Sequence, residues 1–430
     1  MENIYHVRKF IGAGKEIRVK VPGSKSITNR ALLLAALSDK RCTLHGVLFS
    51  DDSRAFLDCL EKLGFALSVN EQAGEVSLQG TGGRIPNPHA EVNVRSAGTA
   101  ARFLTVMLAF AGGEYQMQAS PQMCRRPMKP LLGLLEKAGV SFQFQGQTGH
   151  FPFFMKSKAP SLGEVEIDTG ISSQFASALL MSGILLRDGL KITMLGDRAE
   201  GAYIKMTIAM MKQFGISVER EGGKYLVPPK KAFGLEEYQV EPDVSGAGYF
   251  YAMAPLLQTE VMVENVHMDS LQGDIKFLEV LKNMGCSITE EAAGVGLSGK
   301  GLQGYPGMEV SMKDFSDQTM TMAVLAPFAQ SPTLIRNIGH IRYQETDRIS
   351  AILTELGRMG ISCQEVPEAD GIRIFPGEIK EAEVETYDDH RMAMAFTLIG
   401  MKTGKTAIKN PGCCRKTFEN YFQLIDSLYG

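Results

Sequence analysis

One pattern returns six times along the 430-residue chain, and it constrains the fold more than any other feature. In each copy a small or acidic residue precedes a run rich in alanine, methionine and leucine, and successive starts lie 70, 76, 73, 72 and 72 residues apart. The starts are Ser26, Ser96, Ser172, Ser245, Asp317 and Asp389. A second, amphipathic run ends in a glycine followed by an apolar residue, at Gly64, Gly139, Gly215, Gly285 and Gly360. Such a period indicates an architecture of repeated units.

The repeat predicts an α/β fold of six strand–helix–strand–helix units, each closed by a hairpin. The first run of each unit is apolar on nearly all sides and must be buried, whereas the second is half exposed, so the sheets are expected outside the helices. Six units exceed what one core of this size organises, so we expect two lobes of three units. The divide is expected near residues 240–243. The tail after Asn410 then returns to the lobe that holds the fourth unit.

Composition excludes several classes of protein. The formal net charge is -3 at pH 7, so the chain lacks the basic character of a nucleic-acid binder or a polybasic membrane protein. Its seven cysteines include no CxxC pair and no zinc-ligand spacing, which fits reduced thiols in a cytoplasm. The N-terminus has no apolar signal region, and no apolar run reaches membrane-spanning length. We therefore expect a soluble, cytoplasmic protein.

Cationic side chains gather at the starts of the apolar helices. Lys25 and Arg30 crowd the first start, where the helix dipole disfavours cations unless an anion lies between them and the free amides. Later units carry Ser96, Gly98, Thr99, Arg102, Arg125 and Arg126, then Ser172, Ser173 and Gln174, then Asp317, Arg342, Glu345 and Arg348, then Asp389, His390, Arg391, Arg415 and Lys416. If both lobes turn these starts toward a shared cleft, the site suits a small molecule with several phosphate or carboxylate groups.

Asp317 and Glu345 are the carboxylates in this cationic set, which makes them candidates for proton transfer. No carboxylate cluster has metal-ligand spacing, so we expect acid–base chemistry without a metal or cofactor. Each residue also has a purely structural interpretation. Asp317 and the serines could be helix caps and nothing more. Arg125 and Arg126 could form a solvated turn, and Glu345 could form a surface ion pair with Arg348. The recurrence of polar residues at equivalent positions favours a shared binding site over these structural interpretations.

Eight motifs, in order along the full chain, resemble those of the EPSP synthase (3-phosphoshikimate 1-carboxyvinyltransferase) family. They are PGSKSITNRALLLAAL, SAGTAARF, RRPM, SSQFASALL, SDQTMT, QETDRI, DDHRMAM and KTFENYF. The resemblance implies a two-lobed inverse α/β barrel of six βαβαββ repeats, three per lobe. One lobe would comprise 1–21 and 242–430 and the other 22–241, with the active site in the cleft between them. We expect a monomer that binds two small-molecule substrates.

The implied activity is transfer of the enolpyruvyl group of phosphoenolpyruvate to the 5-hydroxyl of shikimate 3-phosphate. The hydroxyl would attack C2, the methylene carbon would take a proton, and phosphate would then leave. The implied catalytic residues are Asp317, Glu345 and Lys25. The resemblance assigns shikimate 3-phosphate to Lys25, Ser26, Arg30, Ser172, Ser173, Gln174, Tyr203, Asp317 and Gln344. It assigns phosphoenolpyruvate to Lys25, Gly98, Arg126, Gln174, Arg348, Arg391 and Lys416. Gly98 matches the glyphosate-sensitive form, which implies inhibition competitive with phosphoenolpyruvate.

The chain departs from the family pattern at three positions. Gln344 stands where the family usually has lysine, His340 where it has asparagine, and Glu200 where serine is common. The first departure removes a cation expected near the shikimate ring. Gln344→Lys is therefore expected to lower the KM for shikimate 3-phosphate.

Two alternatives stay open. The first is the sister enolpyruvyl transferase that acts on UDP-N-acetylglucosamine and uses a loop cysteine, a role for which Cys124 is the candidate. Cys124 lies only two residues before Arg126, however, and the PGSKS and ETDR motifs belong to the shikimate branch. The second is a non-catalytic, two-lobed protein that binds an anionic metabolite. Asp317 and Glu345 argue against it, because an anion binder gains nothing from carboxylates in a cationic cleft.

Overall fold

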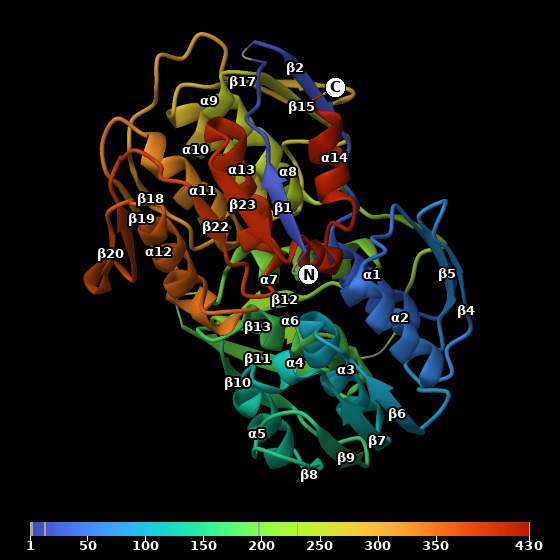
Figure 1. Cartoon of the computed structure of the whole chain (residues 1–430). Helices are drawn as coiled ribbons and strands as arrows, with labels where there is room; N and C mark the ends of the chain where they lie inside the picture. Colours follow the sequence, from blue (N-terminus) through green and yellow to red (C-terminus); the bar gives the residue numbers. More distant parts are fainter. Residues whose placement is uncertain (1–2, 13, 197, 230, 430) are drawn as a thin grey trace. The chain divides into compact units, whose positions relative to one another are not determined.

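The computed structural model describes residues 3–12, 14–196, 198–229 and 231–429 (Figure 1). The chain divides into two compact units. The continuous unit spans Gly23–Val240, and the split unit joins the segment up to Pro22 with the segment from Glu241 onward. These bounds differ by one residue at each crossing from those expected from the sequence. Within the described residues, no helix combines the length and the apolar character needed to cross a bilayer.

The described residues of the continuous unit form three four-stranded sheets. Their strand orders are β14-β3-β5-β4, β6-β7-β9-β8 and β10-β11-β13-β12. The strands are β3 (Arg41–His45), β4 (Leu67–Asn70), β5 (Glu75–Gln79), β6 (His89–Asn93), β7 (Gly113–Gln118), β8 (Ser141–Phe144), β9 (Phe153–Ser157), β10 (Glu164–Asp168), β11 (Leu190–Leu195), β12 (Glu219–Glu221), β13 (Lys224–Val227) and β14 (Glu237–Gln239). The helices are α1 (Lys25–Leu37), α2 (Asp51–Lys62), α3 (Gly98–Ala111), α4 (Pro121–Cys124), α5 (Lys129–Lys137), α6 (Ser173–Ser182) and α7 (Ala202–Gln213), with the short turn η1 (Gly183–Leu185).

The split unit contains the sheets β16-β17-β15-β2, β18-β19-β21-β20 and β1-β23-β22. The strands are β1 (Ile4–Val7), β2 (Glu16–Val19), β15 (Glu260–Glu264), β16 (Ser287–Glu291), β17 (Gly294–Ser298), β18 (Glu309–Ser311), β19 (Thr333–Arg336), β20 (Cys363–Val366), β21 (Gly371–Ile374), β22 (Ala382–Val384) and β23 (Thr406–Lys409). The α-helices are α8 (Val244–Tyr251), α9 (Met253–Leu257), α10 (Phe277–Asn283), α11 (Thr319–Leu325), α12 (Arg348–Arg358), α13 (His390–Thr403) and α14 (Tyr421–Ser427). Short 3-10 turns are η2 (Gly273–Lys276), η3 (Ser316–Gln318), η4 (Ala326–Phe328), η5 (Gly339–Tyr343), η6 (Pro367–Ala369) and η7 (Pro411–Lys416).

The five four-stranded sheets share one pairing pattern. In each, an edge strand pairs in parallel with the next strand, which pairs antiparallel with a hairpin, as in β6, β7, β9 and β8. Two sheets take their parallel edge strand from a distant part of the chain, since β14 pairs with β3 and β2 pairs with β15. The sixth sheet has three strands, and β1 pairs antiparallel with β23 where the other sheets have a hairpin strand. The sixth sheet is therefore completed by the first strand of the chain rather than by a hairpin that follows β23.

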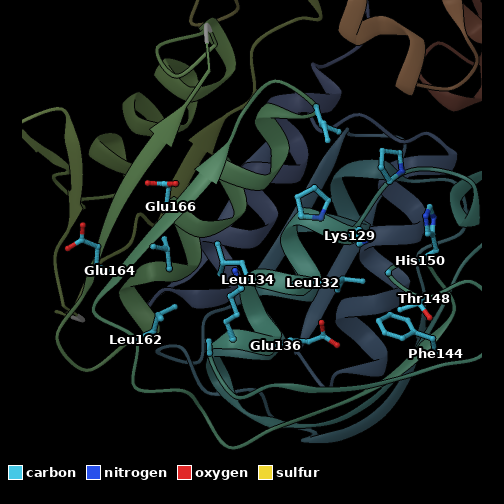
Figure 2. A pocket seen from close by; sticks show the side chains of 18 residues that line it. Lys129, Leu132, Leu134, Glu136, Phe144, Thr148, His150, Leu162, Glu164 and Glu166 are labelled. Atoms are coloured by element: carbon cyan, nitrogen blue, oxygen red, sulfur yellow. The ribbon is translucent and has the colours of Figure 1, made fainter.

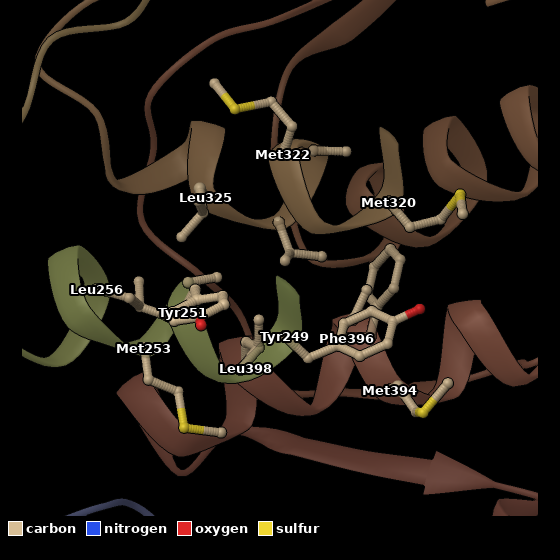
Figure 3. Close-up of a cluster of buried hydrophobic side chains, with 14 of the residues drawn as sticks. Tyr249, Tyr251, Met253, Leu256, Met320, Met322, Leu325, Met394, Phe396 and Leu398 are labelled. Carbon is tan, nitrogen blue, oxygen red and sulfur yellow. The ribbon is translucent and has the colours of Figure 1, made fainter. Parts of the chain in front are cut away.

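The nearly apolar helices form the core of each unit. In the continuous unit α3 packs against α6 and α1, and in the split unit α13 packs against α11 and α8. Figure 3 shows part of the second cluster, in which Met320 and Met322 of α11, Met394 of α13 and the tyrosines of α8 belong to one set of buried side chains. These methionines are at most 1% exposed, which confirms that the methionine-rich runs are core packing.

Candidate active site

Lys25 begins α1 and carries a buried counterion. Its Nζ lies 3.4 Å from Oδ2 of Asp52, in the first turn of α2. The Asp52 side chain is 4% exposed and that of Lys25 is 17% exposed. Ser24, at the cap position of α1, makes no capping bond, and its buried Oγ has no hydrogen-bond partner among the described residues. Ser26 lies inside the helix rather than at its cap. The start of α1 thus presents an ordered ammonium group beside backbone amides without a side-chain cap.

Arg30 points into the interior of the continuous unit. Its Nε donates to Oγ1 of Thr207 at 2.8 Å, Nη2 donates to Oγ of Ser177 at 3.2 Å, and Nη1 donates to the Ser26 carbonyl at 2.9 Å. The guanidinium lies 5.8 Å from the ring centre of Tyr203. Burial lowers the pKa of Arg30 to about 10. The residue is only 1% exposed, and its partners in the described structure are neutral. An anion that reached it would gain a strong charge-assisted hydrogen bond.

Two further guanidinium groups meet at the start of α3. The helix begins at Gly98 without a side-chain cap. A Cβ built on Gly98 would lie 2.7 Å from Nη1 of Arg102 and 2.7 Å from Nη1 of Arg126. Arg102 donates to the Gly98 carbonyl at 3.1 Å, and Arg126 is 9% exposed. Like charges this close repel unless an anion lies between them, so the arrangement suits phosphate or carboxylate. Arg125, the other arginine of the pair, is exposed.

We expect Gly98→Ala to raise the KM for phosphoenolpyruvate. The new methyl group would push both guanidinium groups away from the start of α3. A hydrogen bond to a charged group is worth about 1.5–3 kcal/mol, so the expected increase is roughly tenfold or more. Steady-state kinetics with phosphoenolpyruvate as the varied substrate measures it, and glyphosate inhibition of both enzymes tests competition at the same position. Arg125→Ala, which removes the exposed neighbour, is the matched control. An unchanged KM in Gly98→Ala would contradict the assignment of Gly98.

The polar residues at the start of α6 lie in the same unit. Ser172 caps the helix by accepting a hydrogen bond from the Gln174 amide at 3.3 Å. Ser173 follows and is 6% exposed. The side-chain oxygen of Gln174 is buried without a hydrogen-bond partner among the described residues. A buried amide oxygen costs free energy unless a donor reaches it, so this position fits contact with a ligand hydroxyl or a neighbouring ammonium.

In the split unit, Arg348 is the centre of the second cluster. It is the first residue of α12 and 1% exposed. Its Nε donates to Oδ2 of Asp389 at 2.8 Å, Nη2 donates to Oε2 of Glu345 at 3.0 Å, and Nη1 donates to Oδ1 of Asp317 at 3.3 Å. Burial acts to lower the pKa of Arg348, but the charges of Asp389, Glu345 and Asp317 outweigh it and raise that pKa overall. The Glu345–Arg348 pair is therefore buried, not a surface bridge.

Arg391 and Lys416 complete this cluster. Nη2 of Arg391 donates to Oδ2 of Asp317 at 2.7 Å, and Nη1 donates to the Tyr249 hydroxyl at 3.3 Å. Nζ of Lys416 lies 3.4 Å from Oε1 of Glu345, and both side chains are 8% exposed. Asp317 therefore lies between two guanidinium groups, while Glu345 lies between a guanidinium and an ammonium. Asp317 follows the first residue of η3 and directs its carboxylate to these arginines rather than capping α11.

Gln344 lies beside Arg348 and accepts a hydrogen bond from its Nη1. A lysine here would add a cation next to three carboxylates that already surround Arg348. We still expect Gln344→Lys to lower the KM for shikimate 3-phosphate, because the added ammonium would attract the substrate anion. Initial rates with varied shikimate 3-phosphate measure the change, and Gln344→Met serves as the uncharged control. A KM that stays constant or rises in the lysine variant would count against the expectation.

Several candidates lie outside these clusters. Arg342 pairs with Asp347 at 2.9 Å and with Glu365 at the surface, and Arg415 is exposed. Burial raises the pKa of the Cys124 thiol, against a smaller opposing effect of Arg125. A raised pKa disfavours the thiolate that a reactive cysteine needs. Within the part of the chain described here, no group of three or more His, Cys, Asp or Glu residues could hold a metal ion.

A pocket of about 910 Å³ lies between α5, the 144–150 segment and β10 (Figure 2). Its walls are mainly apolar, and Figure 2 shows Glu164 on the β10 side and His150 across from it. None of the predicted site residues lines it, although Pro127, which follows Arg126, does. The predicted binding residues therefore do not coincide with this pocket.

Sequence reasoning missed four residues of these clusters or their surroundings. In the sequence, Asp52 looks like an ordinary acidic residue in the first turn of a helix. Thr207 and Ser177 look like ordinary polar helix residues, and Tyr249 looks like a residue of the hydrophobic core. Asp389 caps α13 by accepting a hydrogen bond from the Arg391 amide at 2.9 Å, but it also binds Arg348. Burial of an acidic residue next to a predicted cationic site would have been the signal for these residues. A single sequence does not show which acidic residues are buried.

Comparisons with known proteins identify the family of the chain. Residues 14–425 match the family model described as EPSP synthase (3-phosphoshikimate 1-carboxyvinyltransferase). The chain is 42% identical over 406 residues to the 3-phosphoshikimate 1-carboxyvinyltransferase of Nostoc punctiforme, covering 94% of each chain. It is 38% identical over 423 residues to the protein of that name from Neisseria gonorrhoeae, covering 96% of each.

A solved EPSP synthase from Acinetobacter baumannii has the same fold, with a TM-score of 0.79 and 22% sequence identity over 100% of this chain and 98% of that chain. The resemblance recognised in the motifs is thereby confirmed, and the α/β fold with several mixed sheets is that of the solved EPSP synthases. The chain belongs to the EPSP synthase (3-phosphoshikimate 1-carboxyvinyltransferase) family.

Proposed function

We propose that the protein transfers the enolpyruvyl group of phosphoenolpyruvate to the 5-hydroxyl of shikimate 3-phosphate. The products are 5-enolpyruvylshikimate 3-phosphate and phosphate. The observation that carries the proposal is the position of Asp317, a carboxylate held between Arg348 and Arg391 in a family member. A protein that only bound anions would not place a carboxylate at its strongest cation cluster.

The addition step forms a bond between the 5-oxygen and C2 of phosphoenolpyruvate. Asp317 accepts the hydroxyl proton, and Glu345 takes part in proton transfer at the methylene carbon, with Lys416 beside it as a source of positive charge. Loss of a methyl proton and departure of phosphate from C2 then restore the double bond. Arg348, Arg391 and Lys416 would hold the phosphoenolpyruvate anion, because guanidinium groups bind carboxylate and phosphate in a bidentate manner.

The continuous unit supplies the remaining contacts. Lys25 would reach both substrates, and Gly98 with Arg126 would contact phosphoenolpyruvate. The shikimate 3-phosphate residues would be Ser26, Arg30, Ser172, Ser173, Gln174 and Tyr203, with Asp317 and Gln344 from the split unit. The neutral surroundings of Arg30 and the buried, unpartnered oxygen of Gln174 support this part of the proposal.

We further propose that each unit is an inverse α/β barrel of three βαβαββ repeats, and that the protein is a cytoplasmic monomer. The pairing pattern common to five sheets supports the repeats. Seven free thiols fit a reducing compartment.

A phosphate-release assay with phosphoenolpyruvate tests the function. Shikimate 3-phosphate should support turnover and UDP-N-acetylglucosamine should not. Mass spectrometry of the product should show the added enolpyruvyl group. Phosphate release with UDP-N-acetylglucosamine but not with shikimate 3-phosphate would assign the sister activity. No phosphate release with either acceptor would overturn the enzyme proposal.

A further inference from the structure

Glu355, on α12, is a buried carboxylate that the proposed chemistry does not use. Its side chain has no exposed surface. Its Oε1 accepts a hydrogen bond from the Tyr387 hydroxyl at 2.6 Å and another from Nη1 of the half-exposed Arg358 at 2.8 Å, and its Oε2 accepts from the Glu385 amide at 3.2 Å. A buried carboxylate needs such donors, because its loss of hydration is otherwise uncompensated. Two of the three donors come from one short segment, so Glu355 ties that segment to α12.

The backbone of this segment has an unusual conformation. Tyr387 has a φ of 55° and Asp388 a φ of 56°, and among the described residues this is the one place where two consecutive non-glycine residues have positive φ. Bulky side chains disfavour this region, and residues stay in it only where surrounding contacts hold them. The Asp389 amide donates to the Thr386 carbonyl at 2.8 Å and closes the turn. The Tyr387 hydroxyl is therefore an anchor of a turn that leads directly into Asp389.

Asp389 fixes two of the arginines in the second cluster. It accepts two hydrogen bonds from Arg348, from Nε at 2.8 Å and from Nη2 at 3.3 Å, and it accepts one from the Arg391 amide at 2.9 Å. Arg348 and Glu355 are seven residues apart on α12, which is about two helical turns, so they lie on the same side of the helix. The segment is thus fastened to that side of α12 at two places, through Asp389 and through Tyr387.

We propose that Glu355 is a positioning residue that acts through Tyr387 to keep Asp389 aligned with Arg348 and Arg391. This inference rests on the proposed function, in which both arginines hold phosphoenolpyruvate. Glu355 does not contact a substrate, and it forms and breaks no bond in the reaction. Its effect should be selective for phosphoenolpyruvate, because most of the residues proposed to bind shikimate 3-phosphate belong to the continuous unit.

Tyr387→Phe removes the hydroxyl and keeps the ring. The KM for phosphoenolpyruvate should rise about three- to tenfold, the range expected for the loss of one hydrogen bond, while the KM for shikimate 3-phosphate should change by less than about twofold. The kcat should change less than the KM for phosphoenolpyruvate, because Arg348 keeps its bonds to Glu345 and Asp317. Initial rates with each substrate varied in turn measure these effects.

Tyr5→Phe is the matched control. The Tyr5 hydroxyl also donates to a carboxylate, Oδ1 of Asp426 at 2.7 Å, and this bond joins β1 to α14 in the same unit. Removing it takes away the same kind of contact at a place that none of the cluster residues occupies. Both KM values should therefore remain those of the wild-type enzyme.

Glu355→Leu provides a second variant, which removes both hydrogen bonds to the segment. It should raise the KM for phosphoenolpyruvate at least as much as Tyr387→Phe does. The double variant should have no higher KM than Glu355→Leu alone, because the Tyr387 hydroxyl acts through Glu355. Circular dichroism and thermal melts show which variants are folded, and Tyr387→Phe keeps the test available if Glu355→Leu does not fold.

The outcomes separate this inference from the proposed function. With normal wild-type turnover, three results would each overturn the role of Glu355 alone: an unchanged KM for phosphoenolpyruvate in folded Tyr387→Phe, equal increases for both substrates, or an additive increase in the double variant. A wild-type protein without turnover would overturn the proposed function and this inference with it.

Discussion

Lys25→Ala should lower kcat/KM by about a thousandfold or more. The ammonium group is held at the start of α1 by Asp52, and in the proposed function it contacts both substrates. Positive charge placed in advance where negative charge develops is worth about 3–4 kcal/mol per group, which corresponds to factors of about 10²–10³, and loss of binding to two anions adds to this. Initial rates with each substrate varied in turn measure the effect.

The structure also predicts that Lys25→Ala lowers the stability of the protein, which the sequence alone does not reveal. Without Lys25, the carboxylate of Asp52 is left buried, and we expect a loss of about 1–3 kcal/mol in stability. The double variant Lys25→Ala with Asp52→Asn should recover stability in a thermal melt but stay inactive. Lys129→Ala, an exposed lysine of the same unit, should retain full activity. Substantial turnover in a folded Lys25→Ala protein would remove Lys25 from the mechanism.

Asp317→Asn should lower kcat by about 10²–10⁴-fold, the usual contribution of a general base. Asparagine keeps the size of the side chain and can accept a hydrogen bond from one arginine. Arg348 retains Glu345 and Asp389, so the cluster should remain assembled. Affinity for phosphoenolpyruvate should stay constant or increase, because one negative charge has been removed beside two cations. Isothermal calorimetry and steady-state kinetics separate these two effects.

The chain offers a close control for this variant. Asp388 is exposed and has a positive φ of 56°, which asparagine tolerates well. Asp388→Asn should therefore have wild-type kcat and stability. A folded Asp317→Asn enzyme with near-normal kcat would show that another group accepts the hydroxyl proton.

Local pattern was sufficient for much of the fold. The helix starts at Ser172 and Asp389 follow from capping chemistry, and the apolar runs could only be buried. In the strand Glu75–Gln79, buried Val76 and Leu78 alternate with polar residues, as expected for a strand with one face in the core. The first helix differs slightly, because it begins at Lys25 and Ser26 lies within it. Periodicity identifies an element and its buried face, but it does not specify which distant strand completes a sheet, and β14 with β3 is such a case.

The sequence by itself determined the regular spacing of the helix starts, the buried helices and the set of cationic residues at those starts, because these depend on spacing and on the chemistry of each side chain. Only the tertiary structure decided which groups these arginines bind. Arg348 binds Asp389 across 41 residues and Arg391 binds Asp317 across 74, whereas Arg30 turns into a core of hydroxyl groups. The physical reason is that a buried charge takes whichever opposite charge or hydrogen-bonding group the packed helices bring within reach. That choice depends on how three helices pack together rather than on any one segment.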